Sequence, residues 1–311
     1  MSDQPHPQVQ AILQLLEDQS VPPIYSLSVE NARQQMENFA AMREGEPVEE
    51  VQNFEIQGPA EALPVRLYLP DASGPHPVLV FYHGGGFVVG SLDTHDALAR
   101  GLTNAAECAV LSVDYRLAPE HPFPAAVEDA YAAVEWVREY GDTVGLDPER
   151  IAVGGDSAGG NLAAATTLAV RDRGGPALAH QTLIYPAVSS PVLGEFDSYE
   201  ENAEGYFLER RSMEWFVEQY ITTESDVRNE YFAPLLARDL SSVPPATVVT
   251  AGFDPLRDEG RAYADRLRED GIDVEHHSYE DMIHGFASML GAVDAAEDAV
   301  ERMGHELQAS F

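Results

Sequence analysis

Ser157 lies in the run Ile151–Gly160 (IAVGGDSAGG), in which an apolar stretch leads into a Gly-x-Ser-x-Gly sequence. The apolar residues predict a buried strand, and the residues after the serine predict the start of a helix. A serine at such a sharp strand-to-helix turn leaves no space for Cβ atoms two positions to either side, which accounts for Gly155 and Gly159. Its hydroxyl is then exposed at a helix N-terminus. The run therefore predicts a nucleophilic serine.

A serine nucleophile needs a general base, an acid that orients this base, and hydrogen-bond donors for the oxyanion. At strand-to-helix turns of this kind, the acid and the histidine follow the serine along the chain, each after a later strand. Asp254 directly follows the apolar run Thr247–Phe253, and we expect it to be the acid. Asp258 lies about one helical turn further on and is the weaker candidate. We expect Asp258 to support the loop or to cap backbone amides.

The general base must be one of the histidines that follow this acid. There are four of them, His276, His277, His284 and His305. The first two fall inside a strand-like run, 274–279, and the last lies on a predicted terminal helix. His284 lies in a predicted loop, 281–286, immediately after that strand. It is therefore the expected base.

Three consecutive glycines follow the first buried strand, in the run Tyr82–Phe87 (YHGGGF). Three adjacent glycines are conformationally costly, but bare backbone can approach a carbonyl and turn N–H groups toward it. We expect the N–H groups of Gly85 and Gly86 to form an oxyanion hole together with that of Ala158. His83 precedes the serine, and we expect it to brace this loop by hydrogen bonds rather than to act as the base.

The pattern of apolar runs predicts the elements that position these residues. Near-continuous apolar runs, typical of strands buried on both faces of a parallel sheet, occur at Val78–Tyr82, Ala109–Val113, Ile151–Val153, Thr182–Tyr185 and Thr247–Ala251. Helix-like stretches lie between them, at about 94–106, 125–140 and 157–173. This alternation predicts the α/β class, with a mostly parallel central sheet and helices on both faces. Period-2 runs at 54–56 and 65–69 predict edge strands.

Residues 189–242 interrupt this alternation. They contain no sheet-like run but are acidic and rich in aromatic residues, namely Phe196, Tyr199, Tyr206, Phe207, Trp215, Phe216 and Tyr220. We expect a helical cap over the carboxyl ends of the strands; the alternative is a surface excursion that packs its aromatic residues inward. Two helical stretches in residues 1–50, at 9–16 and about 29–43, are expected to join the cap. The core then comprises residues 51–188 and 243–311.

The charge of the chain is strongly unbalanced. Its 311 residues include 53 Asp and Glu against 18 basic residues, all arginine, which gives a formal net charge of −35. Such a surface repels nucleic-acid phosphates and anionic lipids, which excludes both as partners. Molar salt screens this self-repulsion, because the Debye length falls to about 3 Å. We hypothesise a salt-rich cytoplasm; the alternatives are an acidic solubilising surface in an ordinary cell, or an arginine-biased genome.

Other compositional features indicate a soluble cytoplasmic protein. The single cysteine, Cys108, lies in the strand-like run Cys108–Val113 and is expected to pack in the interior. The first residues carry neither a basic region nor an apolar region of a secretion signal. No apolar stretch approaches the length of a membrane span, so we expect no stable membrane association.

Five motifs of this chain occur together, in the same order, in one known family. They are HGGG at 83–86, DYRLAPEHPFPA at 114–125, GDSAGG at 155–160, DPLRDE at 254–259 and HGF at 284–286. With them the chain resembles the hormone-sensitive lipase-like (bacterial family IV) esterases of the α/β-hydrolase fold. The motifs span about 200 residues, which makes the resemblance specific.

The resemblance implies the same roles that the residue types indicate. It implies Ser157 as nucleophile, His284 as general base and then acid, and Asp254 as the orienting acid. Gly85, Gly86 and Ala158 are again the implied oxyanion donors. For the 114–125 motif it implies a structural role, in which Tyr115 and Arg116 brace the oxyanion loop. A homodimer through the last strand or helix is a further implication.

We expect a carboxylesterase that hydrolyses short- to medium-chain acyl esters through an acyl-serine, with neither a metal nor an organic cofactor. An amidase or arylformamidase is the close alternative, because the same triad serves both reactions. A non-catalytic binder of small ligands is another, as in the plant gibberellin receptors. Those receptors have lost the catalytic histidine, whereas His284 is present here. Metal-dependent hydrolysis is the weakest alternative, because no His-Glu-x-x-His run occurs.

Overall fold

An eight-stranded sheet forms the centre of the computed structural model, which describes residues 4–41, 44–190, 192, 194 and 196–311. The strands are β1 (Glu50–Gln57), β2 (Ala62–Leu69), β3 (His76–Tyr82), β4 (Ala109–Val113), β5 (Leu146–Asp156), β6 (His180–Ile184), β7 (Ala246–Phe253) and β8 (Val274–Ile283). Their order across the sheet is β1-β2-β4-β3-β5-β6-β7-β8. Strands β3 to β8 are parallel, and β2 pairs antiparallel with β1 and β4.

This sheet confirms the five predicted buried strands and corrects one prediction about the edges. Only the first of the two period-2 runs lies in an edge strand, β1, because β2 lies between β1 and β4. The alternation in β2 has another cause: Leu63, Val65 and Leu67 are buried, while Arg66 forms ion pairs on its own side of the strand. A period-2 pattern reports partial burial, not the number of neighbouring strands.

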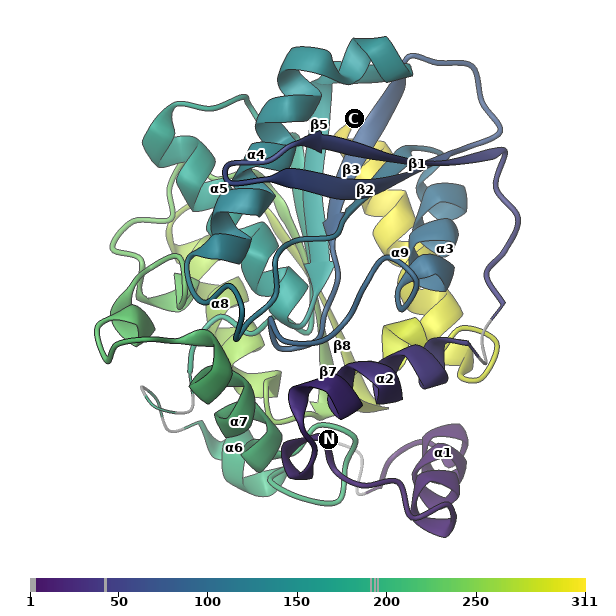
Figure 1. The fold of residues 1–311 in the computed structure, drawn as a ribbon, viewed down its shortest axis with the longest axis vertical. Coiled ribbons are helices and arrows are strands. Elements are labelled where there is room, and N and C mark those ends of the chain that lie inside the picture. The colour runs from purple at the N-terminus through teal and green to yellow at the C-terminus, as the bar shows by residue number, and fades with distance from the viewer. Residues whose placement is uncertain (1–3, 42–43, 191, 193, 195) are drawn as a thin grey trace.

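Helices cover both faces of the sheet (Figure 1). On one face lie α3 (Asp96–Ala106) and α9 (Asp294–Ser310), which pack against each other. The other face carries α4 (Ala125–Tyr140), α5 (Ala158–Arg173) and α8 (Arg257–Glu269). Short 3-10 helices lie at Ile24–Ser26, Gly141–Val144, Asp226–Arg228, Pro234–Leu236 and Phe286–Ser288. The predicted doubly covered, mostly parallel sheet is confirmed.

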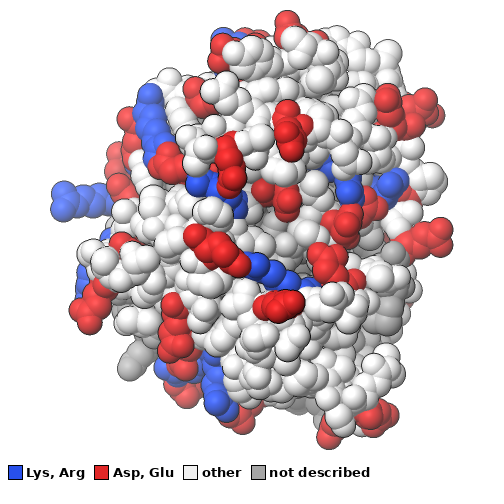
Figure 2. Space-filling model, in the orientation of Figure 1, with Lys and Arg blue, Asp and Glu red and all other residues white. Residues whose placement is uncertain are grey.

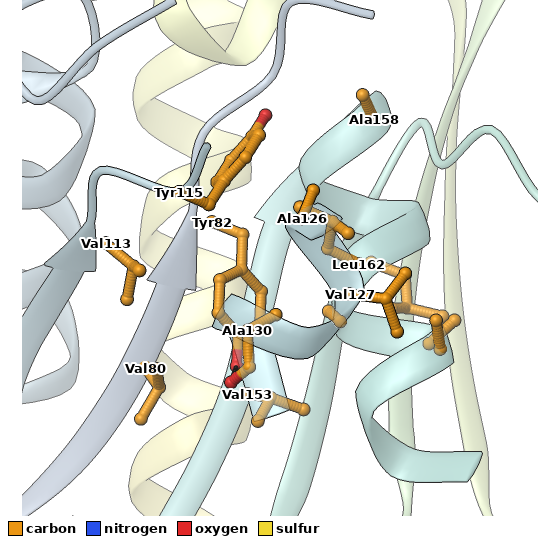
Figure 3. Close-up of a cluster of buried hydrophobic side chains, with 14 of the residues drawn as sticks. Val80, Tyr82, Val113, Tyr115, Ala126, Val127, Ala130, Val153, Ala158 and Leu162 are labelled. Atoms are coloured by element: carbon orange, nitrogen blue, oxygen red, sulfur yellow. Dashed lines mark hydrogen bonds between the residues drawn. The ribbon is translucent and has the colours of Figure 1, made fainter. Parts of the chain in front are cut away.

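Each face of the sheet has its own apolar core. The core between the sheet and α4, α5 and α8 is the larger, and Figure 3 shows part of it. There the fully buried Tyr82, at the end of β3, donates its hydroxyl hydrogen to the carbonyl of Ala130 on α4 at 2.9 Å. The buried phenol thus keeps a hydrogen-bond partner, as buried polar groups must. This contact ties the end of β3 to the helix layer directly beneath the glycine-rich loop.

Four further helices gather at the end of the molecule toward which β3 and β5 run (Figure 1). They are α1 (Pro7–Asp18), α2 (Val29–Ala40), α6 (Asp197–Glu201) and α7 (Arg210–Tyr220). No strand occurs in the described residues of 189–242. The end of the second predicted N-terminal stretch, residues 42–43, lies outside the described residues.

Cys108 is fully buried, as predicted, and burial raises the pKa of its thiol to about 12. It immediately precedes β4, in the core on the α3 and α9 side. A thiol with such a pKa is overwhelmingly protonated at neutral pH and has little nucleophilic character. Within the described ranges, no helix combines the length and the apolar character that crossing a membrane requires.

On the face that Figure 2 shows, acidic side chains are spread out rather than gathered in one patch. Most of the arginines lie in ion pairs with Asp or Glu, several of them with exposed partners. The remaining carboxylates therefore greatly outnumber the available cations and repel one another. Exposed charges of this kind respond to ionic strength.

We predict that the melting temperature rises with KCl concentration and that most of the rise occurs below about 1 M, where the Debye length has already fallen to about 3 Å. Differential scanning calorimetry from dilute buffer to about 3 M KCl measures this. An uncharged osmolyte serves as the control for solute exclusion. A melting temperature that stays constant or falls as KCl is added contradicts a salt-adapted surface.

Candidate active site

The candidate site lies in a crevice set by the strand order. The chain passes from β3 to its neighbour β4 on one side, and then returns to β5 on the other side of β3. In open α/β sheets, ligands bind where the connections diverge in this way, outside the carboxyl ends of the strands. Here the glycine-rich loop follows β3, and Ser157 follows β5.

Ser157 occupies a strained strand-to-helix turn. Its φ of 56° lies in the left-handed region, which a residue with a Cβ adopts only when its surroundings hold it there. The Ser157 N–H donates to the carbonyl of Ile184 at 2.8 Å, which fixes the turn to β6. A Cβ at Gly155 or Gly159 would overlap the Tyr82 carbonyl. The close approach of β3 thus explains both glycines of the motif.

Ser157, His284 and Asp254 form one hydrogen-bonded chain. The Ser157 Oγ lies 2.9 Å from His284 Nε2, and His284 Nδ1 lies 2.8 Å from Asp254 Oδ2. Asp254 directly follows β7, and His284 directly follows β8. The loop expected at 281–286 is shorter than predicted, because β8 continues to Ile283, which pairs with Phe253. The structure therefore brings together three residues that are far apart in the sequence.

The Asp254 carboxylate is buried and receives a second hydrogen bond. The N–H of Leu256 donates to its other oxygen, Oδ1, at 2.8 Å, so the acid cannot rotate freely. Its backbone carbonyl accepts from the Asn202 side chain, which lies just beyond α6. Asp258 is turned away from His284: it pairs with Arg257 and accepts the Ser198 N–H at 3.0 Å. This agrees with the amide-capping role expected for Asp258.

The glycine-rich loop has a backbone that only glycine adopts easily. Gly85 and Gly86 have φ values of 123° and 59°. A Cβ at Gly86 would also overlap the ring of Phe216, which lies on the loop. Among the described residues, no acceptor is within hydrogen-bond range of the N–H groups of Gly85, Gly86 or Ala158. These three donors remain available beside Ser157.

Several contacts hold the glycine-rich loop in place. Burial lowers the pKa of His83 to about 3, so this histidine is neutral and donates from Nδ1 to the Gly84 carbonyl at 2.8 Å. The Tyr115 hydroxyl donates to the His83 carbonyl at 2.7 Å. Arg33 on α2 donates to the Val88 carbonyl at 2.9 Å. The loop is thus held both by the core and by the N-terminal segment.

Arg116 does not brace this loop, contrary to the expectation from the resemblance. Its guanidinium forms two hydrogen bonds, each of 2.8 Å, with the carboxylate of Asp129 on α4. Asp129 is buried, so it requires a partner of opposite charge. The neighbour that does reach the loop is Ala118, whose N–H donates to the Phe87 carbonyl at 2.9 Å. Tyr115 and Ala118 brace the loop, and Arg116 anchors their segment to α4.

A cavity of about 60 Å³ lies beside Ser157. The glycine-rich loop, the serine turn, α7 and α8 contribute most of its lining, which is Gly86, Phe87, Ser157, Ala158, Asn161, Ala187, Ser189, Leu208, Met213, Phe216, Val217, Phe232, Leu256 and Glu259. Met213, Phe216 and Val217 share one face of α7, because residues three and four apart lie together on a helix. His284 is not part of this lining. The lining of the cavity is therefore mostly apolar and does not include the histidine.

The sequence did not single out Glu259, which is the acidic member of the lining. Its Oε1 accepts the N–H groups of Val188 at 2.7 Å and Ser189 at 3.1 Å, and its Oε2 accepts the hydroxyl hydrogen of Tyr199. Burial raises the pKa of Glu259 to about 7, against the lowering effect of these hydrogen bonds. Glu259 thus joins α8 both to the residues that follow β6 and to α6 itself. The signal in the sequence that could have identified Glu259 is its position at the end of the DPLRDE motif.

A serine, a histidine and a carboxylate in one hydrogen-bonded chain, beside unengaged backbone N–H groups at a sheet's carboxyl edge, are the arrangement typical of serine hydrolases with an α/β architecture. Residues 79–288 match the model of the alpha/beta hydrolase fold family, and the chain belongs to this family, among its hormone-sensitive lipase-like esterases.

Characterised relatives and solved structures agree with this assignment. The chain is 46% identical, over 79% of its length and 67% of the relative's, to the carboxylic ester hydrolase LipN of Mycobacterium tuberculosis. It is 36% identical to the ethyl acetate hydrolase of Pseudomonas putida, over 97% and 98% of the two chains. A crystal structure of LAE6, an alpha/beta hydrolase enzyme from the metagenome of Lake Arreo, superposes with a TM-score of 0.95 at 41% identity and covers 99% of each chain. The chain is accordingly a carboxylesterase.

We predict that Asp254→Asn lowers kcat by about 10⁴-fold, because an amide in place of the carboxylate favours the wrong tautomer of His284. Steady-state kinetics on a p-nitrophenyl ester measure the loss, and circular dichroism checks the fold. Asp258→Asn is the matched control and should cost far less, because Asp258 has no contact with the histidine. Equal losses in the two variants contradict the assignment of Asp254.

Proposed function

We propose that this carboxylesterase hydrolyses short- to medium-chain acyl esters, with Ser157 as nucleophile, His284 as general base and then acid, and Asp254 as the acid that orients it. The observation that carries the proposal is the hydrogen-bonded chain from Ser157 Oγ through His284 to Asp254. A nucleophile within hydrogen-bond distance of its base, which is itself held by a third group, is the arrangement that activates a serine.

Each step follows from these positions. His284 Nε2 accepts the hydroxyl proton while Ser157 Oγ attacks the ester carbonyl carbon, and Asp254 stabilises the imidazolium that forms. When the tetrahedral intermediate collapses, His284 returns this proton to the departing alkoxide, and the alcohol leaves. A water molecule then attacks the acyl-serine with the same assistance from the histidine. The products are the carboxylic acid and the free enzyme.

The oxyanion of each tetrahedral intermediate is assigned to the N–H groups of Gly85, Gly86 and Ala158. Support comes from the loop geometry, since Gly86, Ser157 and Ala158 line the same cavity. The three donors also lack other acceptors among the described residues. Each such donor contributes about 3 kcal/mol to transition-state stabilisation.

The cavity beside Ser157 is assigned to the acyl group. The alcohol must leave toward His284, which protonates it, whereas this cavity lacks His284 among its lining residues. At about 60 Å³ the cavity is far smaller than the roughly 300–1,000 Å³ of sites for drug-sized ligands, which favours short acyl chains. The name of the ethyl acetate hydrolase relative points the same way. Residues 1–50 and 189–242 are proposed to act as the cap that closes this space.

The proposal is tested with p-nitrophenyl esters from acetate to palmitate, assayed with the wild type and with Ser157→Ala in dilute buffer and in about 3 M KCl. The expected result is turnover that is greatest for short chains, absent for palmitate and abolished by the substitution. A matching series of anilides tests the amidase alternative. Turnover of anilides in preference to esters, or turnover that survives Ser157→Ala, overturns the proposal.

We predict that Phe216→Ala shifts the acyl preference toward longer chains, because the Phe216 ring lies on Gly86 and lines the cavity, so that its removal enlarges the space. The ratio of kcat/KM for octanoate to that for acetate should rise roughly tenfold or more, which is the effect of a few methylene contacts. Phe207→Ala is the matched control: Phe207 is 38% exposed and lies near Gly285, on the histidine side. An equal shift in both variants contradicts the assignment of this cavity to the acyl group.

The remaining expectations from the sequence stay predictions. They are a cytoplasmic location, operation at high salt, and a homodimer through β8 or α9. Sedimentation equilibrium in low and high salt tests the oligomeric state.

A further inference from the structure

Asp156 immediately precedes the proposed nucleophile, yet it has no part in the proton transfers described above. Its carboxylate is buried, with 5% of the residue exposed. Oδ1 accepts the N–H of Gly84, the first glycine of the loop, at 2.8 Å. A Cβ at Gly84 would overlap this carboxylate, which is the reason for glycine at that position. The turn that carries Ser157 is therefore bonded directly to the loop that carries the oxyanion donors.

His95, the residue before α3, holds the same carboxylate from the other side. Its Nε2 lies 3.2 Å from Asp156 Oδ1 and 3.3 Å from Oδ2. Its Nδ1 lies 2.8 Å from the hydroxyl of Thr94. The Thr94 hydroxyl donates its hydrogen to the Ser91 carbonyl at 2.9 Å, so its oxygen accepts from Nδ1–H of His95, while Nε2–H donates to Asp156. Like Asp156, His95 is buried.

The hydrogen bonds continue outward to the N-terminal segment. The N–H of Ser91 donates to the Thr94 hydroxyl oxygen at 2.8 Å, and the Ser91 hydroxyl donates to Glu37 on α2 at 2.7 Å. Asp156 is thus the inner end of a continuous chain of polar groups that begins on α2. Such a network fixes the positions of its members when each one is satisfied.

The charge of Asp156 gives no electrostatic advantage to the proposed reaction. Burial alone would raise the pKa of this carboxyl, but His95 and the Gly84 N–H lower it, so that it lies below its usual range. The group is then an anion beside the point at which negative charge develops on the substrate oxygen. Coulomb repulsion there opposes the transition state. A benefit of Asp156 to catalysis must come from the position that it imposes on other groups.

We propose that Asp156 and His95 are positioning residues, which hold the Gly84 N–H away from the cavity and thereby aim the next two N–H groups of the loop at the oxyanion. Gly84 is engaged by Asp156, whereas Gly85 and Gly86 have no acceptor among the described residues. The inference rests on the proposed function, because it assumes that those two amides are the oxyanion donors.

The test compares Asp156→Ala, which removes the acceptor of the Gly84 N–H, with Asp156→Asn, which keeps an acceptor oxygen. Asp96→Asn is the matched control. Like Asp156, Asp96 is an ion-paired carboxylate, but it lies at the start of α3 and contacts Tyr68 and Arg100 rather than the glycine-rich loop. His95→Ala is included as a second route to the same disorder, in case Asp156→Ala does not fold. Thermal unfolding reports the folded fraction of every variant.

Two readouts separate positioning from a purely structural role. One is the division of the kinetic effect between kcat and KM on a short-chain p-nitrophenyl ester. The other is the affinity for a short-chain trifluoromethyl ketone, whose hemiketal oxygen occupies the oxyanion position after Ser157 adds to it. For Asp156→Ala, we expect kcat and ketone affinity to fall together by about 100-fold, with KM little changed. Asp156→Asn should lose about tenfold or less, and Asp96→Asn should retain both values.

Other results would overturn the positioning inference or the proposed function. Loss of kcat without a parallel loss of ketone affinity overturns the inference, as does a kcat that rises in Asp156→Asn because a repelling charge is gone. Equal effects in the Ala and Asn variants also overturn it, since hydrogen-bonded positioning requires the Asn variant to be milder. If Ser157→Ala remains active in the same assay, the proposed function itself fails. If Ser157→Ala is inactive while the Asp156 variants match the control, only the positioning role fails.

The coupling of the two residues gives an independent check. If His95 acts through Asp156, adding His95→Ala to Asp156→Ala costs little beyond the single substitution, and the effects are strongly non-additive. Additive losses in kcat would show that His95 acts elsewhere and would remove it from the proposal.

Discussion

The left-handed backbone of Ser157 is the constraint on which the rest of the site depends. A serine at a φ of 56° is held only where neighbouring segments leave no alternative. The Tyr82 carbonyl presses on both glycines of the turn, and Ile184 accepts the Ser157 N–H. The ends of β3, β5 and β6 must therefore pack closely before the hydroxyl can face the crevice. The same packing places the glycine-rich loop, which follows β3, beside the start of α5.

Three buried carboxylates surround a reaction that itself develops negative charge. Asp254, Asp156 and Glu259 are each at most 5% exposed. Each accepts at least one backbone N–H and one side-chain donor: His284 for Asp254, His95 for Asp156 and Tyr199 for Glu259. Buried carboxyl groups are tolerated when their oxygens are hydrogen-bonded in this way. In an acidic chain, the interior carboxylates thus join strands, loops and the 189–242 segment to one another.

The sequence predicted the parts of the site that local patterns encode. Ser157, Asp254 and the glycine loop each follow an apolar strand, and the carboxyl ends of parallel strands share one edge of the sheet. The roles of Glu259 and Arg33 could not be predicted, because their partners lie 71 and 55 residues away and no local pattern specifies such contacts. The order of the strands across the sheet could not be predicted from the sequence either, which explains why β2 was wrongly expected to be an edge strand. The role predicted for Arg116 was wrong, because the 114–125 motif indicates a segment near the glycine-rich loop but not which of its residues contacts the loop.

We propose above all that Ser157 carries the acyl group during turnover. Rapid acid quenching of the enzyme during turnover of a short-chain ester, followed by mass spectrometry of its peptides, tests this most directly. We expect one acyl group per chain, attached to Ser157 and absent from the Ser157→Ala variant. An acyl group on another residue, or turnover with no acylated enzyme under conditions in which deacylation limits the rate, would contradict it.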